Sequence, residues 1–275
     1  MNIQNLIKSL ISIGIEENEA KREVKMLLEH FCNYTEKDSV IGRDLTQEEL
    51  SLIKSKVDIR IESRIPVQYI IGEAYFMNEY FKVTPDVLIP RDETEILVRK
   101  AIEIINKEYF EDVLDIGTGS GCIACTIAKN TNATVLGIDI SSDALRVALD
   151  NVTRLGINNR AIFRKSDLFE KIREGESFDL IISNPPYIPY NTELSQEVQH
   201  EPALALFAEE DGIEFYRKII EKAPQYLNPE GYLMFELGFN ESETVRRMMS
   251  TKFTNIVILK DLANIDRVIF GKIKS

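Results

Sequence analysis

The sequence predicts an α/β protein in which a small helical domain precedes a mainly parallel sheet with helices on both faces. Two observations support this. From Arg91 onward, short apolar runs typical of buried strands alternate with helical patterns. Before residue 70, by contrast, apolar residues recur with helical spacing. A chain of 275 residues is long enough for two domains of this kind.

The helical domain is expected to cover residues 1–72. Apolar residues fall on one helical face over residues 3–10, and the same spacing recurs over residues 20–31. Thr46 followed by Glu49 is a capping-box signature, which predicts that a third helix begins there.

A hairpin linker is expected next, over residues 73–90. Aromatic pairs at positions 75–76 and 80–81 flank three turn-forming residues, which predicts two short strands joined by a tight turn. We expect this segment to act as a semi-rigid connector to the second domain, residues 91–275.

Strands and helices are expected to alternate through the second domain, as in sheets built from parallel strands. The expected helices cover residues 92–106, 142–155 and 212–226, with others after the glycine-rich turn at 117–121 and near Asn240. The expected strands cover residues 113–116, 134–138, 161–163, 178–183, 232–237, 256–259 and 268–271.

Composition excludes several classes of function. The formal net charge of −12, without a cluster of basic residues, argues against direct binding of nucleic acid. No apolar run is long enough to cross a bilayer, so we expect no membrane partner. Three cysteines without a secretory signal indicate a reducing compartment, the cytoplasm. With only two histidines, we expect no metal.

The glycine-rich turn predicts a cofactor site. Asp115 precedes the turn Gly117-Thr118-Gly119-Ser120-Gly121. This spacing departs from the dinucleotide fingerprint, because Cys122 stands where its third glycine would fall. An acidic residue two positions before the first glycine is typical of S-adenosylmethionine loops, since a carboxylate suits the amino group of a cationic cofactor. We therefore predict that Asp115 and the turn bind S-adenosylmethionine, with S-adenosylhomocysteine as product.

Two aspartates at later strand ends are candidates for the same site. Asp139 ends the second strand, where its carboxylate can accept hydrogen bonds from the ribose hydroxyls; the alternative is that it caps the next helix. Asp167 can accept from the adenine amino group while Leu168 packs on the ring; the alternative is a turn aspartate. A redox role for Cys122 and Cys125 is weighed against core packing, which the small apolar sequence around them favours.

The loop Asn184-Pro185-Pro186-Tyr187 directly follows the strand expected at 178–183 and predicts the acceptor site. Asn-Pro often starts a plain turn, but two prolines also stiffen the loop and remove two N–H donors. The Asn184 side-chain oxygen and the Pro185 carbonyl can each accept one N–H from a planar NH2 group, on which Tyr187 can stack. We therefore predict methylation of an amide or exocyclic amino nitrogen. Asn184, Pro185 and Tyr187 are the candidate catalytic residues, and the whole loop, Pro186 included, is the candidate substrate site.

Over nearly its whole length the chain resembles the release-factor glutamine N5-methyltransferase family. The Asn-Pro-Pro-Tyr loop alone is shared with adenine-N6 DNA methyltransferases. The stretches that begin at Arg64 and at Val87 are much more specific to this family. The matching stretches are Arg64-x-Pro66-x-Gln68-Tyr69-Ile70-x-Gly72, Val87-Leu-Ile-Pro-Arg91-x-x-Thr94-Glu95, residues 113–124, residues 183–188, Glu201-Pro202, Asp211-Gly212 and Asp266-Arg267-Val268.

The resemblance implies a Rossmann-like S-adenosylmethionine methyltransferase sheet, with an N-terminal helical domain that docks a class 1 peptide chain release factor. The acceptor would be the side-chain amide of the glutamine in that factor's Gly-Gly-Gln motif. The positions that the resemblance assigns to the cofactor are Gly117, Gly119, Gly121, Asp139 and Asn184.

The chain departs from the family pattern at two places. Asp92 stands where proline is usual, and Glu241 or Ser242 stands near the place of a usual glutamine. For Arg91 and Thr94, a structural role at a helix start and a role on the cofactor side both stay open.

Two other functions compete with this interpretation. A nucleic-acid amino methyltransferase, acting on adenine N6 or guanine N2, would use the same loop. The first 75 residues, however, contain 10 basic against 13 acidic residues, a net charge of 10 − 13 = −3, with no basic stripe. A non-enzymatic scaffold in a translation complex is the other alternative, and the intact cofactor and acceptor loops argue against it.

Overall fold

The computed structural model describes residues 2–274 and divides into two compact units. The first contains the chain up to Glu73 together with Leu194–His200. The second contains Ala74–Glu193 and the chain from Glu201 onward. A short segment from the second half of the sequence therefore belongs to the N-terminal unit, which no local pattern in the sequence indicates.

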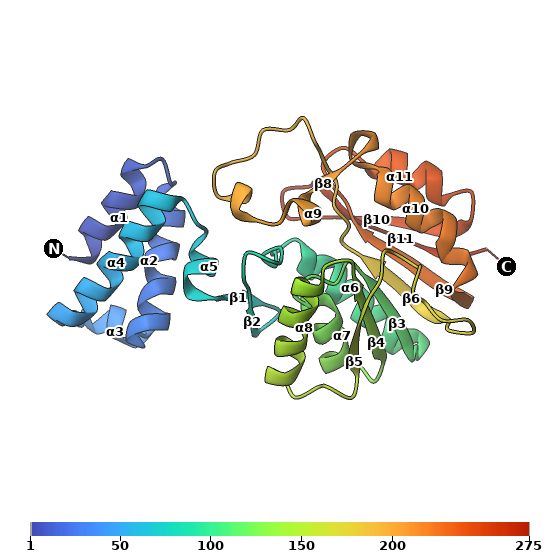
Figure 1. Ribbon diagram of the computed structural model, residues 1–275, viewed down its shortest axis with the longest axis horizontal. Coiled ribbons are helices and arrows are strands. Elements are labelled where there is room, and N and C mark those ends of the chain that lie inside the picture. The colour runs from blue at the N-terminus through green and yellow to red at the C-terminus, as the bar shows by residue number, and fades with distance from the viewer. Residues whose placement is uncertain (1, 275) are drawn as a thin grey trace. The chain divides into compact units, whose positions relative to one another are not determined.

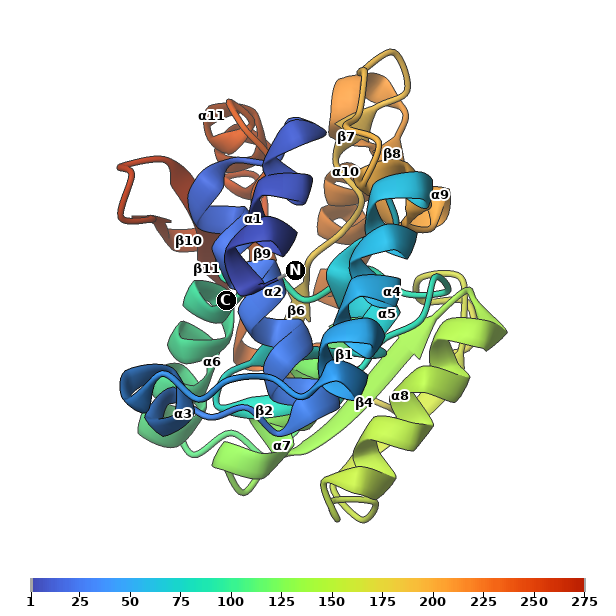
Figure 2. The ribbon, with the colours of Figure 1, turned by 90° about the vertical axis from the view of Figure 1, so that its left-hand side faces the viewer.

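The first unit is helical, as expected. Helices α1, α2 and α4 pack side by side around a core that includes Leu10, Leu27 and Ile53 (Figure 2). Thr46 and Glu49 form the predicted capping box at the start of α4. The short helices α3 and α5 were not expected. The helices of this unit are α1 (Ile3–Ser12), α2 (Glu17–Cys32), α3 (Glu36–Ile41), α4 (Gln47–Ser63) and α5 (Val67–Ile71).

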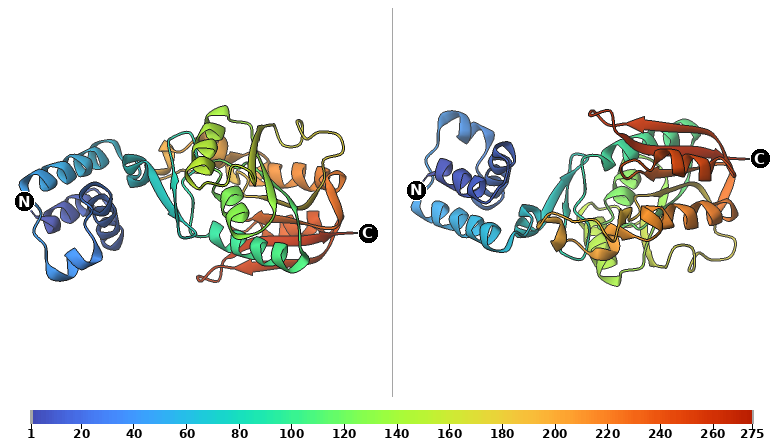
Figure 3. Two further views of the ribbon diagram at one scale, coloured as in Figure 1. Left: turned by 90° about the horizontal axis from the view of Figure 1, so that it is seen from below. Right: turned by 90° about the horizontal axis from the view of Figure 1, so that it is seen from above.

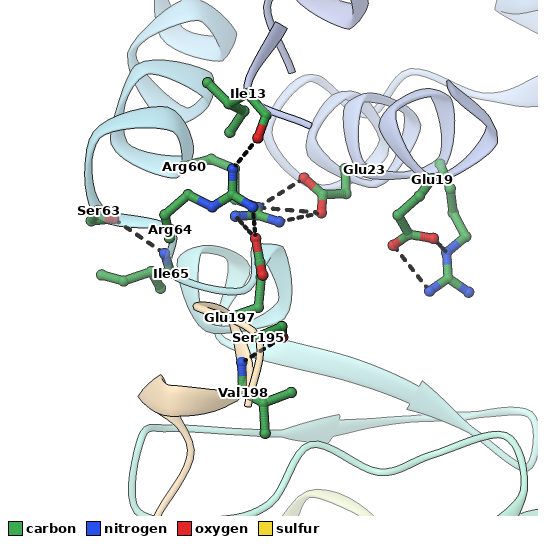
Figure 4. A network of polar contacts seen from close by, with 11 residues as sticks. Ile13, Glu19, Glu23, Arg60, Ser63, Arg64, Ile65, Ser195, Glu197 and Val198 are labelled. Atoms are coloured by element: carbon green, nitrogen blue, oxygen red, sulfur yellow. Dashed lines mark hydrogen bonds and ion pairs between the residues drawn. The ribbon is translucent and has the colours of Figure 1, made fainter. Parts of the chain in front are cut away.

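A buried ion-pair network fixes the segment Leu194–His200 within this unit (Figure 4). The guanidinium of Arg60, on α4, donates to both oxygens of Glu23 at 2.9–3.2 Å and to Glu197 Oε1 at 3.1 Å. Arg64 adds a second ion pair to the same Glu197 oxygen at 2.5 Å. The His200 ring lies 2.8 Å from the Ser63 carbonyl oxygen. Because the side chains of Arg60 and Glu23 are almost fully buried, each charge is stabilised by the other and would be costly to bury alone.

The second unit is built on a seven-stranded sheet in the order β10-β11-β9-β6-β3-β4-β5 (Figure 1). The five strands from β9 to β5 are parallel, whereas β11 is antiparallel to both β9 and β10. The expectation of a mainly parallel sheet is thus confirmed, with the last two strands, drawn red, at one edge (Figure 3). Its strands are β3 (Asp112–Ile116), β4 (Thr134–Asp139), β5 (Ala161–Lys165), β6 (Phe178–Ser183), β9 (Leu227–Glu236), β10 (Phe253–Lys260) and β11 (Asp266–Ile273).

Helices cover both faces of this sheet. Successive strand residues point to opposite sides, so Val113 joins a core with α6, α7 and α8, while Leu114 joins a core with α10 and α11. None of the described helices combines the length and the apolar character needed to cross a membrane. The longer helices are α6 (Thr94–Glu108), α7 (Cys122–Asn130), α8 (Ser142–Arg154), α10 (Glu214–Lys222) and α11 (Ser242–Met249), and α9 (Ala203–Leu206) is a single turn.

The expected hairpin forms from β1 (Glu73–Phe76) and β2 (Glu79–Lys82), but it packs on the second unit. Phe76 and Phe81 are buried in the core next to α6 and α7. The Met77 N–H donates to Glu95 of α6 at 2.8 Å, and the Lys82 N–H donates to Asn151 of α8 at 2.7 Å. These contacts make the hairpin part of the second unit, which differs from the connector that we expected.

We predict that Arg60→Leu lowers the free energy of unfolding by about 3–5 kcal/mol, because it leaves the Glu23 carboxylate buried without its partner. The measurement is urea denaturation followed by far-UV circular dichroism. The double variant Arg60→Leu/Glu23→Leu should regain most of the loss, since no unpaired charge remains. Lys21→Ala breaks the exposed pair with Glu17 and should cost less than about 0.5 kcal/mol. A loss in Arg60→Leu no larger than in Lys21→Ala would contradict the role of the network.

Candidate active site

A cavity in the second unit lies at the carboxyl ends of β3, β4 and β6, where open α/β sheets bind their ligands. It brings together residues that the sequence places in separate motifs: Gly117, Gly119, Asp139, Asp167, Leu168, Asn184, Pro185 and Pro186. Four of the predicted cofactor residues, and Tyr187 of the acceptor loop, are not among the residues that line it. Those four are Asp115, Thr118, Ser120 and Gly121.

The glycine turn presents bare backbone to this cavity. Gly117 and Gly119 have φ angles of +73° and +53°, which side chains rarely adopt, and a Cβ on either would meet open space. At Gly121 the constraint is lack of space, because a Cβ there would lie 3.0 Å from the Phe163 ring and 3.1 Å from Ala148 Cβ. Two glycines thus leave room for a ligand, and the third allows the helix that follows to pack closely.

Asp115 lies beneath the turn and does not line the cavity. Its side chain is fully buried, and Oδ2 accepts a hydrogen bond from the Thr118 hydroxyl at 2.6 Å. Oδ1 has no hydrogen-bond partner in the described residues. Burial raises the pKa of this carboxyl to about 7, against the Thr118 hydrogen bond, which lowers it. The side chain holds the turn in shape in this structure, and direct binding of a ligand by it stays a prediction.

Asp139 connects the end of β4 to the glycine turn. Its Oδ2 accepts from the Gly119 N–H at 2.9 Å, and its Oδ1 accepts from the Ser141 N–H at 2.8 Å. The cap of helix α8 is the hydroxyl of Ser141, which accepts from the Ala144 N–H. Asp139 is therefore not the side-chain cap that the alternative interpretation proposed. Each carboxylate oxygen keeps a lone pair that can accept a hydroxyl.

Apolar side chains form much of the remaining lining of the cavity. Leu168 lies beside Asp167 after β5, with a φ of +44° that the Ser166 hydroxyl stabilises by donating to the Leu168 carbonyl at 2.6 Å. Leu204 of the single-turn helix α9 and Phe215 of α10 were not assigned to the site from the sequence, because neither residue belongs to a cofactor or acceptor motif. The remaining apolar lining residues are Val87, Leu88, Ile116, Ile138, Ile140, Ala144, Ala205 and Ile219.

The charges around the cavity fit a cationic ligand. Three aspartates line it, and no lysine, arginine or histidine of the described residues does. A phosphate-bearing dinucleotide would meet three carboxylates here, whereas a sulfonium with an amino group would meet acceptors of the right sign. Together with the open glycine backbone, this arrangement fits S-adenosylmethionine. Within residues 2–274, no group of three acidic, histidine or cysteine side chains is placed to hold a metal ion.

Asn184 begins the acceptor loop directly after β6. The Ser183 hydroxyl donates to the Ile116 carbonyl at 2.7 Å, which joins the ends of β6 and β3 beside the glycine turn. Asn184 Nδ2 donates to the Thr94 hydroxyl at 3.3 Å, while Asn184 Oδ1 is buried with no partner among the described residues. A buried acceptor without a hydrogen-bond donor lowers the stability of the folded state by about 1–3 kcal/mol. A bound ligand that donates an N–H to Asn184 Oδ1 would remove this cost.

Four residues around this loop were not assigned a role from the sequence. The sequence left two roles open for Thr94. Its hydroxyl donates a hydrogen bond to the buried Glu236 at 2.5 Å. Arg91 donates to both oxygens of the buried Glu201 at 2.7 Å. The family-like stretches around positions 94 and 201 were the available signal, but their partners lie more than 100 residues away and no spacing rule connects them.

Tyr187 does not line the cavity and packs against two glycines. A Cβ on Gly238 would come within 2.8 Å of the Tyr187 ring, and one on Gly212 within 2.4 Å of the Tyr187 carbonyl oxygen. Burial raises the pKa of the Tyr187 phenol above its usual range. Glu241 borders both glycines and accepts from the Gly238 N–H at 2.9 Å, so the unusual residue at this position helps to fix the loop. Stacking of Tyr187 on a substrate stays a prediction.

The two cysteines near the glycine turn, Cys122 and Cys125, are packed in the core. Cys122 and Cys125 are buried free thiols on α7. Burial raises the pKa of Cys122 to about 12, and that of Cys125 rises further for the same reason. Both thiols stay protonated at neutral pH, and a thiol that is not ionised is a poor nucleophile.

Comparisons with known proteins agree with this geometry. The chain matches the family model for a methyltransferase domain over residues 108–269 and the model for a PrmC N-terminal domain over residues 3–72. The release factor glutamine methyltransferase of Geobacter sulfurreducens is 43% identical over 236 residues, which cover 84% of this chain and 81% of the relative. The enzyme of the same name from Bacillus subtilis is 37% identical over 271 residues, which cover 94% and 92%.

Solved structures share the fold at low identity. The hMettl16 catalytic domain aligns with a TM-score of 0.57 at 14% identity, over 84% of this chain and 83% of that one. The Thermus thermophilus 16S rRNA N2 G1207 methyltransferase aligns with a TM-score of 0.55 at 18% identity, over 74% and 50%. The fold, together with the methyltransferase family model that covers more than half of the chain, defines a Rossmann-like methyltransferase. The identities and coverages go further: the chain belongs to the release factor glutamine methyltransferase family.

We predict that Glu241→Gln removes a pH-dependent loss of stability. Burial raises the pKa of Glu241 from 4.5 to about 7, so the folded carboxyl keeps its proton in a range where the unfolded one loses it. The wild-type free energy of unfolding should therefore fall relative to the variant by up to about 3 kcal/mol between pH 4.5 and pH 7, and stay level above that. Urea denaturation at pH 5 and pH 8 measures the difference.

The matched control is Glu243→Gln, an exposed residue in helix α11, which Glu241 directly precedes. Its difference from the wild type should not change between the two pH values. A pH-independent difference for Glu241→Gln as well would show that the buried carboxyl does not titrate as stated.

Proposed function

We propose that this protein transfers a methyl group from S-adenosylmethionine to the side-chain amide nitrogen of the glutamine in the Gly-Gly-Gln motif of class 1 peptide chain release factors. The observation that most directly supports this is the buried, unpaired Asn184 Oδ1 at a strand end beside an open glycine turn. Relatives named for the same activity align over most of the chain.

The acceptor loop binds the glutamine through two oxygens. Asn184 Oδ1 and the Pro185 carbonyl each accept one N–H of the flat carboxamide, and Pro185 and Pro186 supply no competing N–H. Tyr187 closes the loop on the side of Gly238. Two acceptors on one NH2 group select an amide or aminoaryl nitrogen, because a charged ammonium would present a third N–H without a partner.

The cofactor site is formed by the glycine turn and the aspartates. Gly117 and Gly119 allow close backbone approach, Asp139 accepts from the ribose, and Asp167 with Leu168 holds the adenine. Asp115, Thr118, Ser120 and Gly121 shape the turn, and Asp115 is our candidate acceptor for the amino group. When bound, S-adenosylmethionine supplies an electrophilic methyl group on a positively charged sulfur.

Catalysis is mainly positioning in this proposal. The amide nitrogen would gain the methyl group as the carbon–sulfur bond of the donor breaks, and it would release one proton to water. Its two hydrogen bonds to the loop fix the direction in which it faces the donor. Well-oriented reactions of this type gain about 7–11 kcal/mol relative to free reactants. The three carboxylates around the cavity also stabilise the positive charge of the donor during binding.

The helical unit is the proposed docking module for the release factor. The functional division is residues 1–72 for docking, the hairpin of residues 73–90, and residues 91–275 for methyl transfer. The three free cysteines suit a reducing compartment, and we place the reaction in the cytoplasm, where release factors act. We propose no metal and no direct contact with nucleic acid.

The test is incubation with labelled S-adenosylmethionine and a purified class 1 release factor, followed by mass spectrometry of the Gly-Gly-Gln peptide. We expect one methyl group on the glutamine, none on a factor with that glutamine replaced by alanine, and none on DNA or ribosomal RNA. Asn184→Ala should lose turnover and keep the circular dichroism of the folded chain. Equal labelling of the wild-type and glutamine-replaced release factors, or labelling of the nucleic acids alone, would contradict the proposal.

A second prediction concerns the ribose. Asp139→Asn removes one charged acceptor and should weaken the binding of S-adenosylmethionine by about tenfold or more in calorimetry. Asp143→Asn makes the same change two residues into helix α8, where the carboxylate pairs with Arg146 outside the cavity, and should leave affinity unchanged. Equal affinities in the two variants would remove Asp139 from the cofactor site.

A further inference from the structure

The carboxamide of Asn184 has two different ends, and only one of them can serve the proposed reaction. Its oxygen accepts an N–H, whereas its NH2 group would face the NH2 group of the substrate, donor against donor. A half-turn about the last side-chain bond exchanges the two ends at almost no steric cost. A residue that must present oxygen therefore needs a neighbour that holds the NH2 end.

Thr94 is that neighbour. Its hydroxyl lies at the start of helix α6, is 3% exposed, and receives the Asn184 NH2 group at 3.3 Å. The same hydroxyl donates to Glu236 Oε2 at 2.5 Å. Glu236 is the last residue of β9, is 2% exposed, and follows Phe235, which pairs with Ser183 in the neighbouring strand. The three side chains form one chain of hydrogen bonds from three separate elements.

The single hydrogen of the threonine hydroxyl sets the direction of this chain. An ionised carboxylate can only accept, so the Thr94 hydrogen must point to Glu236. The Thr94 oxygen can then only accept from Asn184, which requires the NH2 end of the carboxamide to face it. Asn184 Oδ1 is left as the free acceptor, and it is the atom that has no partner in the structure.

We propose that Thr94 and Glu236 are positioning residues for methyl transfer, which hold the Asn184 carboxamide with its oxygen toward the substrate amide. This inference rests on the proposed function, because it assigns the orientation of the residue that binds the acceptor nitrogen. Neither residue touches the reacting atoms. Both act through Asn184, and a helix cap is not an alternative for Thr94, because α6 has no side-chain cap hydrogen bond.

Protonation of Glu236 would release the orientation. A protonated carboxyl can donate to Thr94, and the Thr94 hydrogen is then free to turn to Asn184 and hold its oxygen end. Burial raises the pKa of Glu236 to about 7, so this change falls in the neutral range. Other groups also act on this pKa: Glu93 raises it, while the Thr94 hydrogen bond, Arg267 and Arg91 lower it. The phenol of Tyr187 and the thiol of Cys122 face the same carboxyl.

The first test replaces Thr94. Thr94→Val keeps the shape and removes the hydroxyl, and we expect kcat to fall about tenfold or more while the affinity for S-adenosylmethionine changes less than about twofold. Thr94→Ser keeps the hydroxyl and should restore kcat to within about threefold of wild type. A kcat of Thr94→Val within twofold of wild type, with the cofactor bound normally, would overturn the proposal.

A readout that does not depend on turnover is the NMR signal of the Asn184 side-chain NH2 group in the folded, 15N-asparagine-labelled protein. Its assignment comes from the signal that is missing in Asn184→Ala. We expect the signal to move on Thr94→Val, to stay near its place on Thr94→Ser, and to titrate in the wild type with Glu236. A signal that is unchanged by Thr94→Val would contradict the hydrogen bond itself.

The second test uses Glu236→Gln, which keeps an acceptor for Thr94 and removes the titration. In the wild type, kcat should fall several-fold as the pH drops from 8 to 6, because a proton on Glu236 frees the carboxamide. In Glu236→Gln this fall should be absent. A profile of the same shape in both proteins would overturn the role of Glu236, even if Thr94→Val fails to fold.

Failure of this inference is distinguishable from failure of the proposed function. If the wild-type protein does not methylate the glutamine of the release factor, the proposed function fails. If it does so and the Thr94 and Glu236 variants keep wild-type kcat and pH profile, only the positioning role fails.

Discussion

The register of three parallel strands is the constraint on which the site depends. Ser183 at the end of β6 pairs with Ile116 of β3 on one side and with Phe235 of β9 on the other. That register sets the glycine turn, the acceptor loop and Glu236 at the same edge of the sheet. Because side chains alternate along a strand, a slip by one residue would turn Glu236 to the opposite face and separate it from Thr94. Continuous apolar strands and the Ser183 hydrogen bond to Ile116 hold this alignment.

Sequence patterns predicted the parts of the site that are local. The glycine turn and the loop at Asn184 each follow an apolar strand, and parallel strands bring such turns to one edge. The hydrogen bond between Thr94 and Glu236 could not be predicted, because 142 residues separate the two and no spacing rule connects the stretch around Thr94 with Glu236. The same holds for Glu197, whose partner Arg60 is 137 residues away. For Tyr187 the motif was recognisable in the sequence, but its packing against Gly212 and Gly238 could not be predicted.

Several carboxyls near the site are buried without a matching positive charge. Asp115, Glu236 and Glu241 each have a pKa raised by burial to about 7. Raised values of this kind make the folded state less stable as the pH increases toward neutrality. The interior next to the cofactor turn and the acceptor loop is therefore held in a costly arrangement. Such groups concentrate where function fixes the geometry, and stability is supplied by the apolar cores on both faces of the sheet.

The network around Arg60 also constrains recombination between genes of this family. The N-terminal unit includes Leu194–His200, so a fragment that stops at residue 72 lacks Glu197 and leaves Arg60 with one of its two anionic partners. Exchange of the first unit between relatives by recombination at a single junction would pair an arginine of one parent with a glutamate of the other. The two positions should consequently be inherited together, although they lie at distant points of the reading frame.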